Sequence, residues 1–248
     1  MIKKLDWRIW LAFILVAASA GSYIVHYLIF RDAHHIFIYM IGDIAFLFIS
    51  VLVVTLFIER VLAQREKRAL INKLNMVIGI FFSEIGLKLM QQFNAFVSKS
   101  GDLRYRLEIK PGWTGKDFLA AAEAARRFPY EIRVDLPALV ELQTYLSEKR
   151  DFLVRLLENP NLLEHERFTN LLWAVFHLAE ELSFRGDRIE HLPDADYAHL
   201  GGDLKRAYSQ IAGEWMLYTW HLKRSYPFLF SLAARVNPFL PNPTAIID

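Results

Sequence analysis

The sequence predicts an all-α membrane protein, in which a two-helix transmembrane hairpin continues into a long cytoplasmic helix and then a cytoplasmic helical bundle. Three observations predict this architecture. Two apolar runs of more than twenty residues lie near the N-terminus, a helical apolar pattern follows the second run, and the remaining chain alternates helix-start with helix-stop signals. The 248 residues suffice for a membrane anchor and one further domain.

Residues 1–58 contain the predicted hairpin. Residues 9–30 form a run of 22 without a formal charge, and residues 36–58 form a run of 23 with one charge, Asp43. At about 1.5 Å per helical residue, each run is long enough to cross a hydrocarbon core about 30 Å thick. A cleavable signal peptide is the alternative for the first run, but its small residues, 17–22, lie inside the apolar stretch rather than after it.

Basic residues flank the two runs on one side. They are Lys3, Lys4 and Arg8 before the first run, and Arg60, Arg65, Lys67, Arg68 and Lys73 after the second. The turn of about five residues between the runs offers one firm positive charge, Arg31. Because basic residues favour the cytoplasmic side, both termini are expected there. A turn this short leaves no external ligand-binding domain.

Asp43 predicts a polar cluster inside the membrane. A carboxylate in mid-span costs about 2.5–3.5 kcal/mol, and sixteen Leu, Ile, Val and Phe residues in the same run offset this by about 0.3–0.6 kcal/mol each. Folding the hairpin about residues 32–33 brings Asp43 level with Ser22, and Tyr39 level with His26. We expect these four side chains to form either a hydrogen-bonded staple for the hairpin or its oligomer, or an ion or proton site.

Residues 59–97 are expected to extend the second span as one long helix, because strong helix formers separate residues 58 and 70. Apolar residues then recur at spacings of three and four, which is typical of a helix face. The predicted packing residues, within or between subunits, are Gly79, Phe81, Ser83, Ile85 and Gly86. A kink at Gly79 or Gly86 is one alternative, and a membrane-surface segment over residues 76–82 is another.

Residues 98–115 read as an irregular linker, in which the alternation at residues 103–109 predicts a short strand. Residues 116–236 read as the helical bundle, and residues 237–248 as an extended tail. Helices are expected at 116–128, 135–158, 164–184, 194–224 and 227–235. Thr114 with Asp117 forms a capping box, and Asp135 with Pro137 opens the next helix.

The bundle core is expected to be aromatic, because large rings recur at helical spacing. These rings are Trp173, Phe176, Trp215, Tyr218 and Trp220. Such stripes form a core far more often than they bind a cofactor.

Five stretches resemble a family of small, uncharacterised prokaryotic two-span membrane proteins. They are residues 34–39, 42–46, 75–79, 81–84 and 171–177. The resemblance covers most of the chain, and it implies a prokaryotic source and therefore a location in the cytoplasmic (inner) membrane. It supplies no activity, substrate or site residue.

Few chemistries are compatible with the composition. The absence of cysteine excludes disulfides and thiolate sites, and a net charge of +2 gives no support for nucleic-acid binding. Phosphate-binding and dinucleotide-binding glycine motifs do not occur, and neither does the Glu-x-x-His pair of di-iron bundles. No cofactor is expected.

One loose set of residues suggests a metal. His177 and Glu181 lie at i,i+4 on one predicted helix, and Glu214 and His221 lie at i,i+7 on another. Imidazole and carboxylate groups are ligands for Zn²⁺ or Mn²⁺ if the helices bring them together. A buried polar network is the alternative. Asp194, Asp196 and His199 read as polar residues at a helix start, near its positive dipole end.

The function predicted first is that of a non-enzymatic, homo-oligomeric membrane-anchored scaffold, sensor or regulator. Its expected partners are the lipid bilayer, further copies of the chain and a cytoplasmic protein. The alternatives are an oligomeric ion- or proton-conducting pore using Asp43 and His26, and a membrane-bound metal-dependent enzyme.

Overall fold

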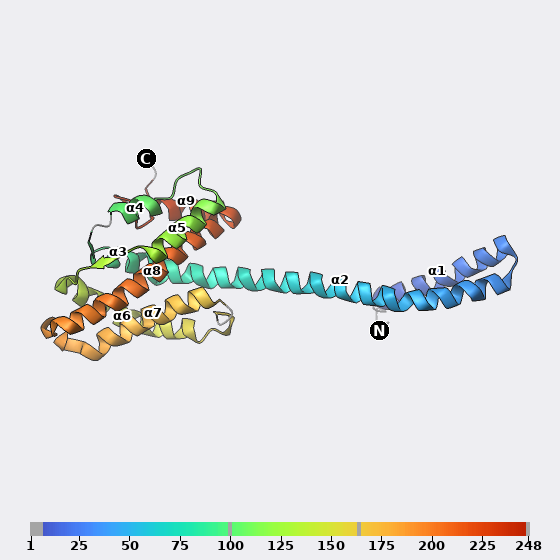
Figure 1. The fold of residues 1–248 in the computed structure, drawn as a ribbon, viewed down its shortest axis with the longest axis horizontal. Coiled ribbons are helices and arrows are strands. Elements are labelled where there is room, and N and C mark those ends of the chain that lie inside the picture. The colour runs from blue at the N-terminus through green and yellow to red at the C-terminus, as the bar shows by residue number, and fades with distance from the viewer. Residues whose placement is uncertain (1–6, 99–100, 163–164, 247–248) are drawn as a thin grey trace, which may run out of the picture. The chain divides into compact units, whose positions relative to one another are not determined.

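The computed structural model describes residues 7–98, 101–162 and 165–246, and nearly all the elements in them are helices (Figure 1). The all-helical fold class is therefore confirmed. The chain divides into two compact units, Met1–Lys67 and Arg68–Asp248. We call them the hairpin unit and the bundle unit.

In the hairpin unit, a two-residue turn separates α1 (Trp7–Phe30) from α2 (Ala33–Phe81). Arg31 adopts a left-handed conformation, with a φ of 54°, and its N–H donates to the Tyr27 carbonyl at 2.8 Å. The Asp32 carboxylate then accepts hydrogen bonds from the backbone N–H groups of His34 and His35, at 2.9 and 3.3 Å. This capping starts α2 three residues before the predicted second span begins.

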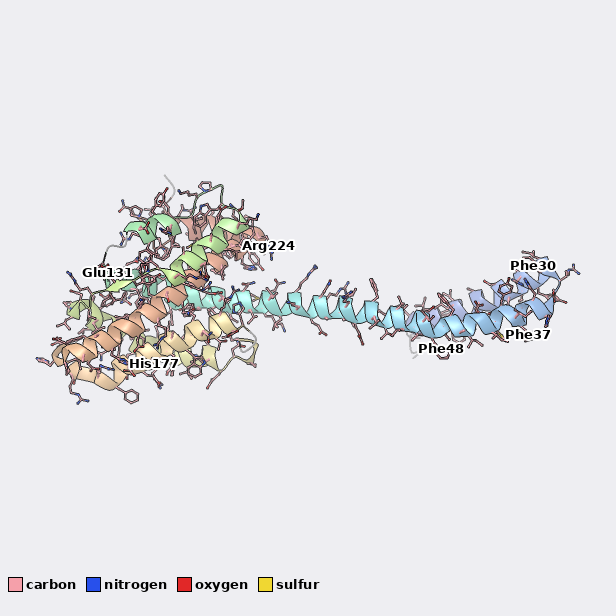
Figure 2. All side chains as sticks on the ribbon, viewed as in Figure 1. Phe30, Phe37, Phe48, Glu131, His177 and Arg224 are labelled. Carbon is pink, nitrogen blue, oxygen red and sulfur yellow. The ribbon has the colours of Figure 1, made fainter. Side chains whose placement is uncertain are left out.

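Most large apolar side chains of the hairpin unit are exposed. By length and composition, the helical stretches Trp10–Phe30 and Ala33–Phe93 could each cross a membrane, and no residue in the most apolar window of either is buried. Phe30, Phe37 and Phe48, labelled in Figure 2, are among the exposed side chains.

The long helix predicted after the second span is present, but its hydrogen-bonding pattern changes from α to π near its end. Helix α2 runs without a break to Phe81, a π-helical turn η1 covers Phe82–Gly86, and α3 (Leu87–Phe93) follows. The Leu87 N–H bonds to the Phe82 carbonyl, five residues back, as a π-turn requires. The helix ends at Phe93, four residues earlier than predicted.

The strand predicted at residues 103–109 is wrong. That segment begins as helix α4 (Gly101–Leu107), while the small sheet pairs β1 (Val97–Ser98) with β2 (Glu131–Ile132), antiparallel. Leu103 and Leu107 are four residues apart and both fully buried, so they form a helix face as readily as alternate strand positions. An Arg106–Asp102 ion pair at 3.0 Å also favours the helix.

The bundle unit contains the helices that the capping signals predict. They are α5 (Gly115–Arg127), α6 (Leu136–Leu157), α7 (Glu166–Arg185), α8 (Asp194–Ser225) and α9 (Pro227–Arg235). Two short 3-10 turns that the sequence did not predict, η2 (Pro160–Leu162) and η3 (Gly186–His191), follow α6 and α7. The Thr114–Asp117 capping box forms, and the Asp135 side chain accepts from the Ala138 N–H at 3.1 Å. Helix α8 is central, because α5, α7 and α9 all pack on it, while α6 packs on α7 (Figure 1).

The aromatic core is smaller than predicted. Trp215 is buried, but Trp173 is 55% exposed, because the buried face of α7 contains its neighbours Leu171, Leu172 and Val175. The predicted extended tail also needs correction, since the chain turns after Asn237 and buries Phe239.

Candidate functional site

A cluster of imidazole and carboxylate groups lies where α7 packs against α8, beside His177 in Figure 2. His177 and Glu181 belong to α7, and His199 and Asp203 belong to α8. Each pair is spaced i,i+4, so its two side chains project from the same face of their helix. Packing of the two faces brings all four groups together.

In this cluster, each histidine faces both carboxylates. His177 Nε2 lies 3.6 Å from Asp203 Oδ2 and 3.9 Å from Glu181 Oε1. His199 Nε2 lies 3.4 Å from Asp203 Oδ2 and 3.6 Å from Glu181 Oε2. One ligand atom from each of Glu181, His199 and Asp203 falls within 4.8 Å of the other two.

Asp203 is the buried member of the cluster. Its side chain is 3% exposed, whereas those of His177 and His199 are 44% and 55% exposed. Asp203 Oδ1 accepts from Arg206 Nη1 at 3.1 Å, but Oδ2 has no hydrogen-bond partner among the described residues. A buried carboxylate oxygen without a partner is costly, so its presence calls for an explanation.

Arg185 links the cluster to the start of α8. Its guanidinium donates to Glu181 Oε2 and to Asp196 Oδ1, both at 2.6 Å. These hydrogen bonds lower the pKa of both carboxyl groups below their ordinary values. Glu181 is therefore ionised at neutral pH and is held in one orientation.

The structure brings together two of the four residues predicted as metal ligands, His177 and Glu181. Glu214 lies elsewhere in the core, where Arg126 pairs with it at 3.3 Å and burial raises its pKa. His221 lies next to the Tyr226 ring, and burial lowers its pKa.

The sequence analysis did not predict Asp203 as a site residue, and it interpreted His199 only as a polar residue at the start of a helix. The i,i+4 spacing of His199 and Asp203 was one signal for this pair. The short connection η3 was another: α7 ends at Arg185 and α8 begins at Asp194, so the end of α7 and the first turns of α8 meet.

Three of the four residues predicted to form a polar cluster in the hairpin lie along one groove. His26, Tyr39 and Asp43 line one groove of about 360 Å³ between α1 and α2. The Ser22 hydroxyl instead donates to the Ala18 carbonyl of its own helix at 2.9 Å. His35, which the sequence analysis did not include, lies in the groove with its ring 4.6 Å from that of Tyr39.

The residues predicted for helix packing lie in the bundle unit, against helices of the same chain. Phe81 meets the Phe168 ring edge-on, and the Gly79 backbone approaches the Tyr218 hydroxyl. Ile85 and Gly86 are buried, while Ser83 is exposed and lines an open pocket with Gly79.

Comparisons with known proteins cover nearly the whole chain. Residues 70–235 match the family model described as the C-terminal helical domain of uncharacterized protein MJ1433, and residues 3–62 match its N-terminal helical domain. Uncharacterized protein MJ1433 from Methanocaldococcus jannaschii is 40% identical over 238 residues, which cover 96% of this chain and 95% of that protein. No solved structure matches.

Proposed function

The chain belongs to the MJ1433 family of small prokaryotic proteins, and from this premise we propose that it is a two-span membrane protein. Helix α1 and the first part of α2 cross the cytoplasmic membrane as a hairpin. The helical bundle then works on the cytoplasmic side as a non-enzymatic scaffold, sensor or regulator. Its partners are the bilayer, further copies of the chain and a cytoplasmic protein.

The exposed apolar surface of the hairpin unit is the observation that carries the proposal. Long apolar helices in the core of a soluble protein are mostly buried, whereas none of the residues in these two apolar windows is. Leaving such a surface in water costs about 25 cal/mol per Å² of apolar area. A bilayer removes that cost, and both helices have the length to span one. A secretory signal would account for α1 alone.

The flanking charges favour cytoplasmic termini. Basic residues precede α1, and a second basic set lies on α2 from Arg60 to Lys73. The turn between the helices carries Arg31, but Asp32 follows it directly. This distribution is typical of a hairpin with its turn outside the cytoplasm.

The bundle interior supports a structural role. Among the described residues, four polar side chains are buried: Asp203, Glu214, Thr219 and Asn237. Glu214 pairs with Arg126, the Thr219 hydroxyl donates to backbone carbonyls, and Asn237 bonds both Trp215 and the Leu107 carbonyl. Three of the four therefore stabilise the packing, whereas Asp203 has an oxygen, Oδ2, without a hydrogen-bond partner among the described residues.

A pore is the second candidate, and the groove in the hairpin unit favours it. His26 Nε2 is buried there without a hydrogen-bond partner among the described residues, and Asp43 lines the same groove. Ionisable groups inside a span commonly mark an ion or proton path. Ion flux into vesicles containing the wild type, compared with Asp43→Asn, tests this candidate. Flux that is absent in the wild type excludes it.

Reporter fusions test the membrane proposal. A reporter that is active only outside the cytoplasm should be silent when fused after Asp248 and active when inserted at Ala33. The protein should also stay in the membrane fraction after alkaline washing. Release by the wash would contradict the two spans, and activity of the fusion after Asp248 would reverse the orientation.

A further inference from the structure

We propose that His177, Glu181, His199 and Asp203 bind one divalent transition-metal ion of the Zn²⁺ class. The proposal goes beyond the membrane role and does not depend on it, because all four residues lie within the bundle unit. It also differs from the metal set that the sequence predicts, since Asp203 and His199 replace Glu214 and His221.

The spacing of the four groups fits a tetrahedral ion. Zn²⁺ binds imidazole nitrogen and carboxylate oxygen at about 2.0–2.2 Å, so neighbouring ligand atoms around it lie about 3.3–3.6 Å apart. The histidine–carboxylate distances in the cluster are 3.4 and 3.6 Å to Asp203 Oδ2 and 3.9 Å to Glu181 Oε1, the carboxylate oxygen that Arg185 leaves free. Small side-chain movements of His177 and Glu181 would bring the longest of them into this range.

Asp203 is the observation that points to a ligand. Its Oδ2 is buried, has no hydrogen-bond partner among the described residues, and faces the Nε2 atoms of His177 and His199. Hydrogen bonds from protonated histidines would be about 2.7–2.9 Å long. The observed 3.4 and 3.6 Å are too long for those bonds but suitable for three ligands around one ion.

Two arginines hold the carboxylates from outside. Arg206 donates to Asp203 Oδ1, which leaves Oδ2 directed at the histidines. Arg185 donates to Glu181 Oε2, which leaves Oε1 facing His177. Outer partners of this kind orient the ligands in metal sites.

The charge balance and the access both favour a cation. Together with Asp196, three carboxylates face two guanidinium groups, so the cluster keeps one excess negative charge. The exposed histidine side chains allow an ion to enter without opening the core. Two imidazoles with two carboxylates suit Zn²⁺ better than Mg²⁺ or Ca²⁺, which take oxygen ligands.

Metal binding by the full-length protein in detergent tests the proposal. The purification tag is removed, the protein is stripped with a chelator, and Zn²⁺ is titrated in competition with a chromophoric chelator. We expect one Zn²⁺ per chain. Added Co²⁺ should give the visible absorption of a tetrahedral complex.

Variants in the exposed histidines locate the ion. His177→Ala and His199→Ala should each weaken Zn²⁺ binding at least about 10-fold, because loss of an outer partner alone typically costs 10–100-fold. His221→Ala on α8 is the matched control and should bind like the wild type. Asp203→Asn should also weaken binding, but its burial makes the two histidine variants the decisive pair.

Two results would overturn the site. One is a wild type without stoichiometric Zn²⁺ binding. The other is equal affinity in His177→Ala, His199→Ala and the control. Either result would leave the cluster as a polar network between α7 and α8.

Discussion

Phe57 and Phe81 lie on the same helix, α2, but Phe57 is 68% exposed and Phe81 is completely buried. The same contrast separates the two units. In the hairpin unit, Leu, Ile, Val and Phe side chains face outward along both helices, whereas in the bundle unit they fill a continuous core. Both regions contain the same apolar residue types, but the runs at residues 9–30 and 36–58 hold a single formal charge, Asp43.

The difference in exposure reflects what packs against the apolar side chains of each unit. The part of α2 in the bundle unit, with η1 and α3 after it, meets α7 and α8 of its own chain; for example, Phe82 lies 5.1 Å from the Trp215 ring. Each large apolar side chain buried in this way contributes about 1.5–3 kcal/mol. Within the hairpin unit, α1 and α2 leave most of their large apolar side chains exposed, and the proposed bilayer would cover them.

The largest effect is expected from a substitution in the buried core of the bundle unit. Phe81→Ala should destabilise the bundle by about 3–5 kcal/mol, because it leaves a cavity beside Phe168. Phe57→Ala, the matched control on the same helix, should leave the unfolding temperature of the bundle nearly unchanged. Thermal unfolding in detergent, followed by tryptophan fluorescence, measures both. Equal losses would mean that the bundle also depends on the hairpin surface.

The substitution Asp43→Leu tests whether the exposed apolar helices of the hairpin unit lie in a membrane. The change should favour membrane insertion by about 2.5–3.5 kcal/mol, because a carboxylate no longer enters the apolar phase. Bundle unfolding should not change. An insertion assay on the isolated second span measures the effect, with Ser50→Leu as an uncharged control. If insertion stays the same, Asp43 does not lie in the apolar part of the membrane.

Glycine substitutions sharpen the contrast on a smaller scale. A Cβ at Gly86 would lie 2.5 Å from a Phe82 ring carbon, whereas a Cβ at Gly42 would have no other side chain within 4 Å. Gly86→Ala should therefore destabilise the bundle by about 1–3 kcal/mol, and Gly42→Ala should not. Chemical unfolding gives the difference. A lower oligomer mass for Gly42→Ala would instead reveal close contacts between hairpins of different copies.

Arg185→Met should have the smallest effect, and one that depends on pH. Arg185 lowers the pKa of Glu181 below 4.5 and that of Asp196 below 3.8. Its stabilisation is therefore present above these values and is lost as the pH falls through the lowered pKa values. Unfolding temperatures of wild type and variant should differ at neutral pH and converge in acid. Arg127→Met, in an exposed ion pair with Glu123, should show little difference at any pH.

Elements with local signals were predictable. The capping box at Thr114 and Asp117 and the cap at Asp135 start helices where expected, because these bonds join residues close in the chain. The segment at residues 103–109 was ambiguous, since its leucines satisfy both periods. The resemblance to a prokaryotic family read from short stretches is confirmed by matches over nearly the whole chain.

The sequence by itself determined the two long apolar helices, the helical character of the segment after the second apolar run and the i,i+4 spacing of His177 and Glu181, since each depends only on composition or spacing along one helix. Only the tertiary structure decided that Asp203 and His199 join that pair. It also placed Glu214 with Arg126 and buried Phe81 inside the same chain. The physical reason is that contacts between helices depend on the register at which they pack, and that register is set by the whole core rather than by any one segment.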